Sequence, residues 1–150
     1  MTGRALMIGL LLFAGVFAAG LWYAQVYAFY EETEADAVTV AGESYPVTDW
    51  EGIDAATSPL KLRSCFRLTE AAAAEIAERL DPFEDATPLV APAWFECYDA
   101  GSLTADLEAG RANAYLAAGE EEPGADRVMV LYPDGRAYQW RQLTEEFANQ

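Results

Sequence analysis

The chain has 150 residues, a formal net charge of −16 and no histidine. Without histidine, a Ser-His-Asp or Cys-His catalytic site within this chain is excluded, and the usual ligand of zinc and haem is missing. Haem attachment through a Cys-x-x-Cys-His motif is excluded for the same reason. No motif specifies a reaction, and we expect no enzyme, no cofactor and no metal site.

An apolar run covers residues 5–30 and is interrupted by one polar side chain, Gln25. A bilayer-spanning helix needs about 20 such residues, whereas the apolar region of a signal peptide needs about 7–15. Aromatic rings favour the membrane–water boundary, and they gather at the end of this run: Trp22, Tyr23, Tyr27, Phe29 and Tyr30. We predict a retained transmembrane helix over residues 5–30. The alternative is a signal peptide that is cut near residues 18–20.

Charges on the two flanks of the run predict its orientation. The N-terminal flank carries Arg4, whereas the other flank opens with the acids Glu31, Glu32, Glu34 and Asp36. Positive charge is retained on the cytoplasmic side of a membrane. We therefore expect residues 1–4 in the cytoplasm and residues 31–150 outside it, which is the periplasm for a bacterial inner-membrane protein.

Small residues recur at intervals of four along the run. Gly15 and Ala19 form one row, and Gly20, Ala24 and Ala28 form another. Such rows let two membrane helices approach closely, so they predict packing against integral membrane proteins. The alternative is a lipid-facing helix that is merely rich in alanine.

The part of the chain after residue 30 is strongly acidic. It holds all 25 acidic residues and eight of the nine basic ones, a formal net charge of −17. Such a surface repels nucleic acid and anionic lipid headgroups, and it attracts a basic protein or divalent cations. We expect residues 31–58 to be an acidic tether and irregular segment, whose first four acids steer a basic partner. Two short β-branched stretches around Gly42 indicate a weak hairpin or an edge strand within it. Solubility, or adaptation to a salty habitat, is the competing explanation of the charge.

Two cysteines, Cys65 and Cys97, lie among apolar and aromatic neighbours that are typical of strands. In an oxidising compartment an even pair favours a disulfide, which would stabilise the domain by about 3–4 kcal/mol. Two buried free thiols are an alternative. Another is a reactive thiolate at Cys65, since Arg63 and Arg67 would lower its pKa.

The segment 60–68 alternates in the manner of a strand. One face would carry Leu60, Leu62, Ser64, Phe66 and Leu68, and the other would carry Lys61, Arg63, Cys65 and Arg67. The second face concentrates basic residues in one row. It is either a docking stripe for an acidic partner, made of Lys61, Arg63 and Arg67, or a solvated strand face.

Two helices are expected in the middle of the domain. Thr69 caps the first, over residues 70–80, and Ser102 or Thr104 caps the second, which ends at Gly110. Residues 81–92 form a loop bounded by prolines. Its acids lack the spacing of an EF-hand calcium loop, so a surface loop is the simpler interpretation. Residues 93–99 are predicted to form a strand.

The clearest hairpin comes last. Residues 127–132 and 136–143 flank the turn sequence Pro-Asp-Gly, and residues 112–118 are predicted to form a further strand. The expected fold is α+β: one N-terminal transmembrane helix, then a domain over residues 59–150 with a mainly antiparallel sheet and two helices.

The block "AWFECYDAGSLTADLEAGRANAYLAAGEE…GADRVMVLYPDGRAYQWRQL", within residues 93–143, resembles a small uncharacterised family of alphaproteobacterial proteins. Members of that family share one N-terminal membrane helix and this C-terminal block. The resemblance implies a single-pass protein of a Gram-negative inner membrane with a periplasmic domain. It implies no catalytic residues.

These patterns favour a non-catalytic accessory or interaction subunit of an inner-membrane complex. A concrete version is a respiratory subunit whose acidic domain attracts a basic electron carrier such as cytochrome c. A membrane-tethered assembly factor or chaperone for envelope proteins is a second hypothesis. The third is a thiol-redox protein that uses Cys65 or Cys97.

Overall fold

The computed structural model describes residues 2–150, and the chain divides into two compact units that meet between Tyr30 and Glu31. The first unit consists of α1 (Gly3–Tyr23) and a π-helical segment, η1 (Ala24–Ala28). Together they form one helix of 26 residues whose most apolar 18-residue window has a mean hydropathy of 2.2, so the helix is long and apolar enough to cross a membrane. None of that window is buried in the described part of the chain.

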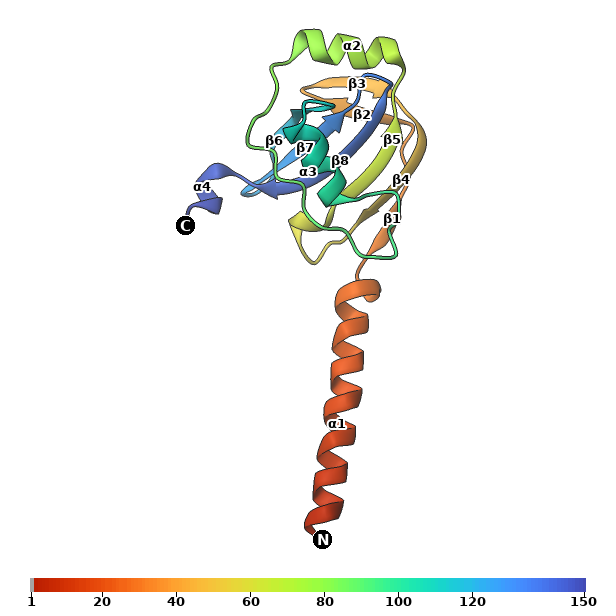
Figure 1. Ribbon diagram of the computed structural model, residues 1–150, viewed down its shortest axis with the longest axis vertical. Helices are drawn as coiled ribbons and strands as arrows, with labels where there is room; N and C mark the ends of the chain where they lie inside the picture. The colour runs from red at the N-terminus through yellow and green to blue at the C-terminus, as the bar shows by residue number, and fades with distance from the viewer. Residues whose placement is uncertain (1) are drawn as a thin grey trace. The chain divides into compact units, whose positions relative to one another are not determined.

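The second unit is built on a six-stranded sheet in which every neighbouring pair is antiparallel (Figure 1). The strand order is β1-β4-β5-β8-β7-β6. The bounds are β1 (Glu31–Thr33), β4 (Thr48–Asp54), β5 (Arg63–Arg67), β6 (Asn113–Glu122), β7 (Ala125–Leu131) and β8 (Arg136–Leu143). The predicted α+β class is therefore confirmed, and so is the hairpin of β7 and β8 around Pro-Asp-Gly.

One face of the sheet is covered by a separate hairpin, β2 (Ala37–Val40) and β3 (Glu43–Pro46), and by α2 (Glu70–Arg79). Their apolar side chains join those of the sheet in one core cluster. Its members include Val38, Val40, Tyr45, Phe66, Ile76, Tyr115, Met129 and Leu131. The Thr69 side chain accepts a hydrogen bond from the Ala72 N–H and so caps α2 as predicted.

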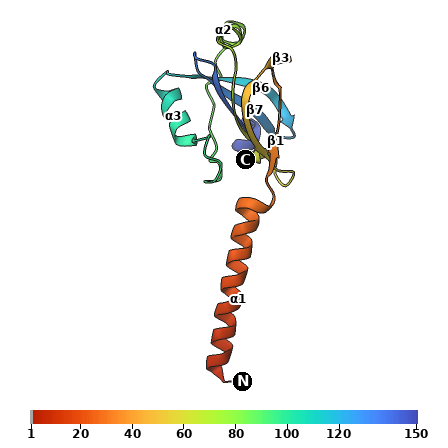
Figure 2. The same cartoon turned by 90° about the vertical axis from the view of Figure 1, so that its right-hand side faces the viewer.

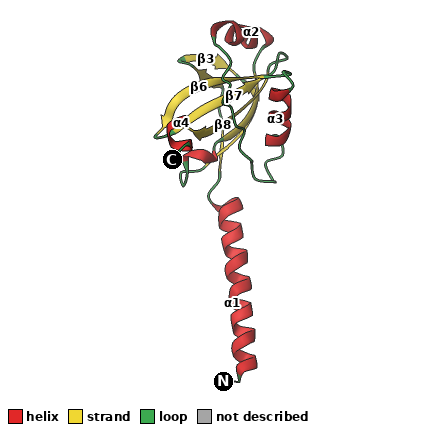
Figure 3. Cartoon of the chain, turned by 60° about the vertical axis from the view of Figure 1, so that its left-hand side comes forward, coloured by secondary structure: helices red, strands yellow, loops and turns green. Residues whose placement is uncertain are grey.

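The opposite face of the sheet is covered by a loop, residues 81–99, and by α3 (Ala100–Glu108), as Figures 2 and 3 show. We call residues 81–99 the covering segment. Register places Trp140 of β8 between Arg63 and Val128 on this face, and Trp140 has no exposed surface. A short 3-10 helix, η2 (Pro59–Lys61), and a C-terminal helix, α4 (Glu145–Ala148), were not expected.

Residues 31–58 correct one prediction, because this segment is not an irregular tether, although the hairpin indicated around Gly42 is present as β2 and β3. It forms four strands, and residues 31–33 pair directly with β4. The reason lies in its alternation: Val38, Val40 and Tyr45 are buried in the core, whereas the residues between them are exposed. The hairpin is needed to cover a sheet face that α2 alone leaves open.

The strand predicted over residues 93–99 is also wrong. These residues form turns, with the Phe95 N–H bonded to the Pro92 carbonyl, and Asp99 rather than Ser102 or Thr104 caps α3. Burial falls on Phe95 and Tyr98, three residues apart, and not on alternate residues. Buried residues three positions apart are typical of a turn, because the buried side chains of a strand lie two positions apart.

Gly135 offers a test of the turn between β7 and β8. Its φ is +91°, and a Cβ there would overlap the carbonyl oxygen of Leu68. We expect Gly135→Ala to lower the free energy of unfolding by about 2 kcal/mol or more, measured by urea denaturation of the full-length protein in mild detergent.

Gly42→Ala is the matched control, because Gly42 has a φ of +86° but no atom within 4 Å of the added carbon. It should lose only the backbone strain, about 1 kcal/mol. Equal losses at the two positions would contradict the overlap with Leu68.

Candidate functional site

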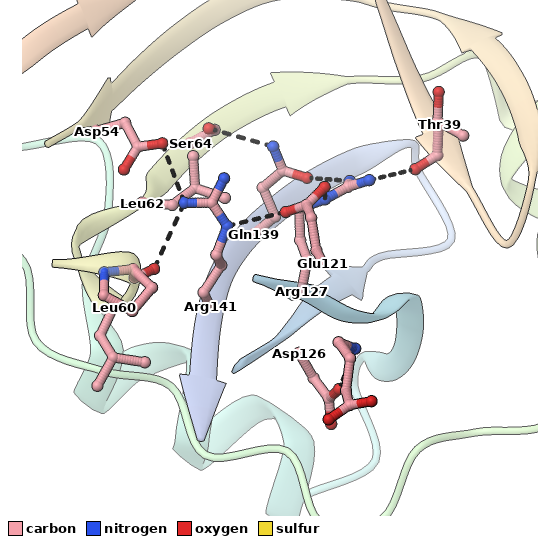
Figure 4. A network of polar contacts seen from close by, with 12 residues as sticks. Thr39, Asp54, Leu60, Leu62, Ser64, Glu121, Asp126, Arg127, Gln139 and Arg141 are labelled. Atoms are coloured by element: carbon pink, nitrogen blue, oxygen red, sulfur yellow. Dashed lines mark hydrogen bonds and ion pairs between the residues drawn. The ribbon is translucent and has the colours of Figure 1, made fainter. Parts of the chain in front are cut away.

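A buried polar network crosses the sheet on the face that carries the β2–β3 hairpin (Figure 4). At its centre lies Arg127 of β7, whose side chain is 9% exposed. Its guanidinium donates to Glu121 at 2.8 Å, to the Gln139 side chain at 2.9 Å and to the Thr39 carbonyl at 2.9 Å. Gln139 in turn donates to the Ser64 hydroxyl at 3.3 Å. These contacts join β2, β5, β6, β7 and β8.

Arg141 extends the network to the outer strands. It donates to the second Glu121 oxygen at 2.8 Å and to Asp54 of β4 at 3.0 Å. Burial raises the pKa of Glu121, but the hydrogen bonds and charges of Arg141 and Arg127 outweigh it, so this pKa lies below its usual range. Two guanidinium groups and two carboxylates thus neutralise one another. The network is a structural brace, and no charge in it is left over for a ligand.

Removing Arg127 should be costly. Arg127→Gln removes the donor to the Thr39 carbonyl and one of the two guanidinium partners of Glu121, whose side chain is 28% exposed and keeps Arg141. Leaving buried acceptors such as the Thr39 carbonyl without a donor costs about 1–3 kcal/mol, and we expect a loss in this range in urea denaturation of the full-length protein.

The control is Arg111→Gln, since Arg111 is paired with Asp106 but 61% exposed. An exposed pair contributes about 0–1 kcal/mol. If both variants lose less than 1 kcal/mol, the network is not bracing the sheet.

Arg63 corrects the predicted docking stripe. It is 5% exposed, and its guanidinium donates to four carbonyl oxygens. Two belong to the preceding turn, Leu60 and Leu62, at 2.7 and 2.5 Å, and two belong to the covering segment, Leu89 and Val90, at 3.1 and 3.0 Å. Arg63 is therefore occupied inside the domain and is not part of a surface.

Of the other two members of that stripe, Lys61 lies outside the strand and Arg67 is its last residue. Lys61 belongs to η2, whereas Arg67 ends β5 half-exposed and lies 3.9 Å from Asp49. The prediction failed because the covering segment packs on this face of the strand. The sequence pattern of β5 alone does not reveal that cover.

The predicted Cys65–Cys97 disulfide is present, with a Cα–Cα distance of 6.3 Å. Cys65 is buried on the covered face of β5, and Cys97 reaches it from the covering segment. Both thiols are therefore used, and no free cysteine remains in residues 2–150.

A hollow of about 370 Å³ opens beside this disulfide, at the outer edge of the sheet. One wall comes from β1 and β4, and the other comes from residues 94–96 of the covering segment. Its lining residues are Glu32, Thr33, Glu34, Trp50, Glu51, Gly52, Ile53, Trp94, Phe95 and Glu96. We call it the acidic hollow, because four carboxylates and no basic side chain line it.

The four carboxylates of the acidic hollow are exposed, and within residues 2–150 no hydrogen bond or ion pair engages them. The Trp50 indole is turned toward the hairpin face of the sheet, where it stacks on Phe66 at 5.2 Å and donates to the Thr33 carbonyl at 2.7 Å, so Trp94 is the tryptophan of the opposite wall. Carboxylates beside aromatic faces suit a cationic side chain, since both attract positive charge.

The structure separates the four acids that were expected to act together. Glu32 and Glu34 line the acidic hollow. Glu31 lines a different hollow, of about 580 Å³, beside Asp54 and Arg141. Asp36 is exposed at the base of the β2–β3 hairpin, where its carbonyl accepts from the Val47 N–H.

Sequence reasoning missed Glu51, Glu96 and the two tryptophans of the acidic hollow. Their segments are far apart in the chain and meet only through the sheet and the disulfide. One signal was available: Glu96 precedes Cys97, and a Cys65–Cys97 link would bring Glu96 toward the strand next to β5.

The small residues that were predicted to pack against other membrane helices all lie in the first unit. Gly15, Ala19 and Gly20 lie in α1, whereas Ala24 and Ala28 lie in η1. No atom lies within 4 Å of the position that a Cβ would take at Gly15 or Gly20. That surface is open to close approach, and its packing against another helix stays a prediction.

In the described part of the chain, no group of three or more Asp, Glu or Cys side chains could hold a metal ion. Tyr98 is buried with its hydroxyl unpartnered, and burial raises the pKa of this phenol well above its usual value. The four carboxylates of the acidic hollow offer attraction of positive charge.

Fold and site together define a chain with one long apolar N-terminal helix and an acidic α+β domain that is closed by a disulfide. The chain belongs to a family of unknown function, DUF6446, whose model matches residues 33–150. The resemblance to an uncharacterised family is thereby confirmed. Neither the curated proteins nor the solved structures yielded a match to compare with it.

Proposed function

We propose that this protein is a membrane-anchored, non-catalytic accessory or interaction subunit that recruits a basic partner through the acidic hollow. The observation that carries the proposal is the hollow itself: four carboxylates, two tryptophans and no basic side chain in its lining. A lysine or arginine side chain of a partner would find Coulomb attraction from four carboxylates there.

The anchor rests on the apolar helix of residues 3–28. Its large side chains are exposed all around, including Leu10, Phe13 and Val16, each at least 67% exposed. Covering such a surface with lipid removes a large unfavourable contact with water. A retained helix is favoured over a cleaved signal, because its length of 26 residues exceeds what a signal peptide needs.

The orientation follows from charge, with Arg4 before the helix and the acids of β1 after it. The domain then lies outside the cytoplasm, on the periplasmic side of a Gram-negative inner membrane. The disulfide suits that oxidising compartment. A respiratory complex that receives a basic electron carrier such as cytochrome c is the concrete version that we favour.

The anchor predicts a topology that protease can test. Protease added to spheroplasts should digest the acidic domain while the cytoplasmic marker proteins remain intact. The domain should stay with the membrane fraction after washing at high salt and high pH.

Two results would count against this topology. Protection of the domain until the inner membrane is broken would place it in the cytoplasm. Release of the domain into the soluble fraction would indicate that the helix is cleaved.

The acidic hollow predicts salt-dependent recruitment. We propose to change Glu32, Glu34, Glu51 and Glu96 to Gln and to measure the association rate of cytochrome c with the full-length protein in nanodiscs. At low salt the variant should associate about tenfold more slowly than the parent protein. The difference should shrink at physiological ionic strength, where the Debye length is about 8 Å.

A control variant separates the site from the net charge. Glu78, Asp81, Glu84 and Glu108 are also exposed, and they lie outside the acidic hollow. Changing these four to the matching amides alters the net charge equally. If both variants slow association to the same extent, the overall charge and not the acidic hollow attracts the partner.

A further inference from the structure

The two walls of the acidic hollow are held in different ways. The wall of β1 and β4 belongs to the sheet, where backbone hydrogen bonds fix it. The opposite wall, residues 94–96, lies in the covering segment, which has no helix or strand of its own. The size of the hollow therefore depends on what fastens the covering segment to the sheet.

The Cys65–Cys97 disulfide fastens that wall directly beside the acids. Cys97 follows Glu96 in the chain, and Cys65 is the register partner of Glu51 across β4 and β5. The disulfide thus joins Cys65, the register partner of Glu51, to Cys97, the residue that follows Glu96.

The earlier part of the covering segment is held independently of the disulfide. Arg63 holds Leu89 and Val90, and the Gln142 side chain holds Asp85 and Thr87 at 2.9 and 2.8 Å. After residue 99, α3 begins with its own cap. Residues 91–98 are the stretch between these anchors. Phe95 and Tyr98 are buried within it, the Tyr98 ring packs edge-on against Tyr138 of β8, and the disulfide adds the covalent link to the sheet.

We propose that the Cys65–Cys97 disulfide gates the acidic hollow, so that the oxidised protein binds a basic partner and the reduced protein binds it weakly. This inference rests on the proposed function of the hollow. A dithiol reductant transfers two electrons and two protons: the Cys65–Cys97 bond becomes two thiols, and the reductant becomes a disulfide. The two sulfur atoms then separate, and the wall with Trp94 and Glu96 moves away from Glu32, Glu34 and Glu51.

The test compares the oxidised and reduced full-length protein in nanodiscs, with cytochrome c at low salt as the basic probe. The reduced thiols are blocked with a neutral alkylating reagent, and a Cys65→Ala, Cys97→Ala double variant serves as a second reduced form. We expect the dissociation constant to rise about tenfold on reduction and in the double variant. The four-amide variant of the hollow should show no such redox dependence.

Hydrogen exchange distinguishes release of the wall from unfolding. Amides of residues 91–98 should lose protection on reduction, whereas those of β7 and β8 should keep it. Loss of protection throughout the sheet would overturn the gate, because the disulfide would then hold the whole domain and not one wall.

The failure of the gate and the failure of the proposed function give different results. Equal binding by the oxidised and reduced forms would overturn the gate and leave recruitment by the hollow standing. No binding by the oxidised form would overturn the proposed function, and the gate with it.

Discussion

The covering segment is held on its sheet face by hydrogen bonds from polar side chains of the strands beneath it. The covering segment has neither helix nor strand, so its backbone groups find no partners within a regular element, and leaving them buried and unpaired would be costly. Arg63 and Gln142 supply hydrogen-bond partners, because each extends from a strand and bonds main-chain groups of the covering segment. Trp140 can be fully buried only because this cover is in place.

The same constraint explains why a charged residue lies inside the domain. A guanidinium presents five N–H donors in a planar fork, and Arg63 uses them on four carbonyl oxygens. Arg127 plays the equivalent part on the other face, where it holds the Thr39 carbonyl of a hairpin that pairs with no strand of the sheet. Each cover is thus bonded by one buried arginine of the sheet, and on the hairpin face Arg79 of α2 also donates to the carbonyls of Val40 and Ala41.

Features that were predictable from the sequence are those set by neighbours in the chain. The Pro-Asp-Gly turn, the Thr69 cap and the long apolar helix each carry their signal within a few residues. Arg63 could not be foreseen as a buried residue, because its partners at Leu89 and Val90 depend on how a distant loop folds back. The acids of β1 were recognised from composition, whereas Glu51 and Glu96 join them only through pairing of β4 with β5 and through the disulfide.

The strand order has a consequence for the time course of synthesis. β5 pairs with β8, so Arg63 lies opposite Trp140 in the register, and the middle of the sheet closes only after the last long strand has left the ribosome. Cys97 is made before β8, and the covalent link to Cys65 can therefore form on a nascent chain whose sheet is still incomplete. A chain that stops short of β8 would keep β5 and β7 without the strand that joins them. Such fragments present open strand edges, which are ready sites for aggregation and for recognition by proteases.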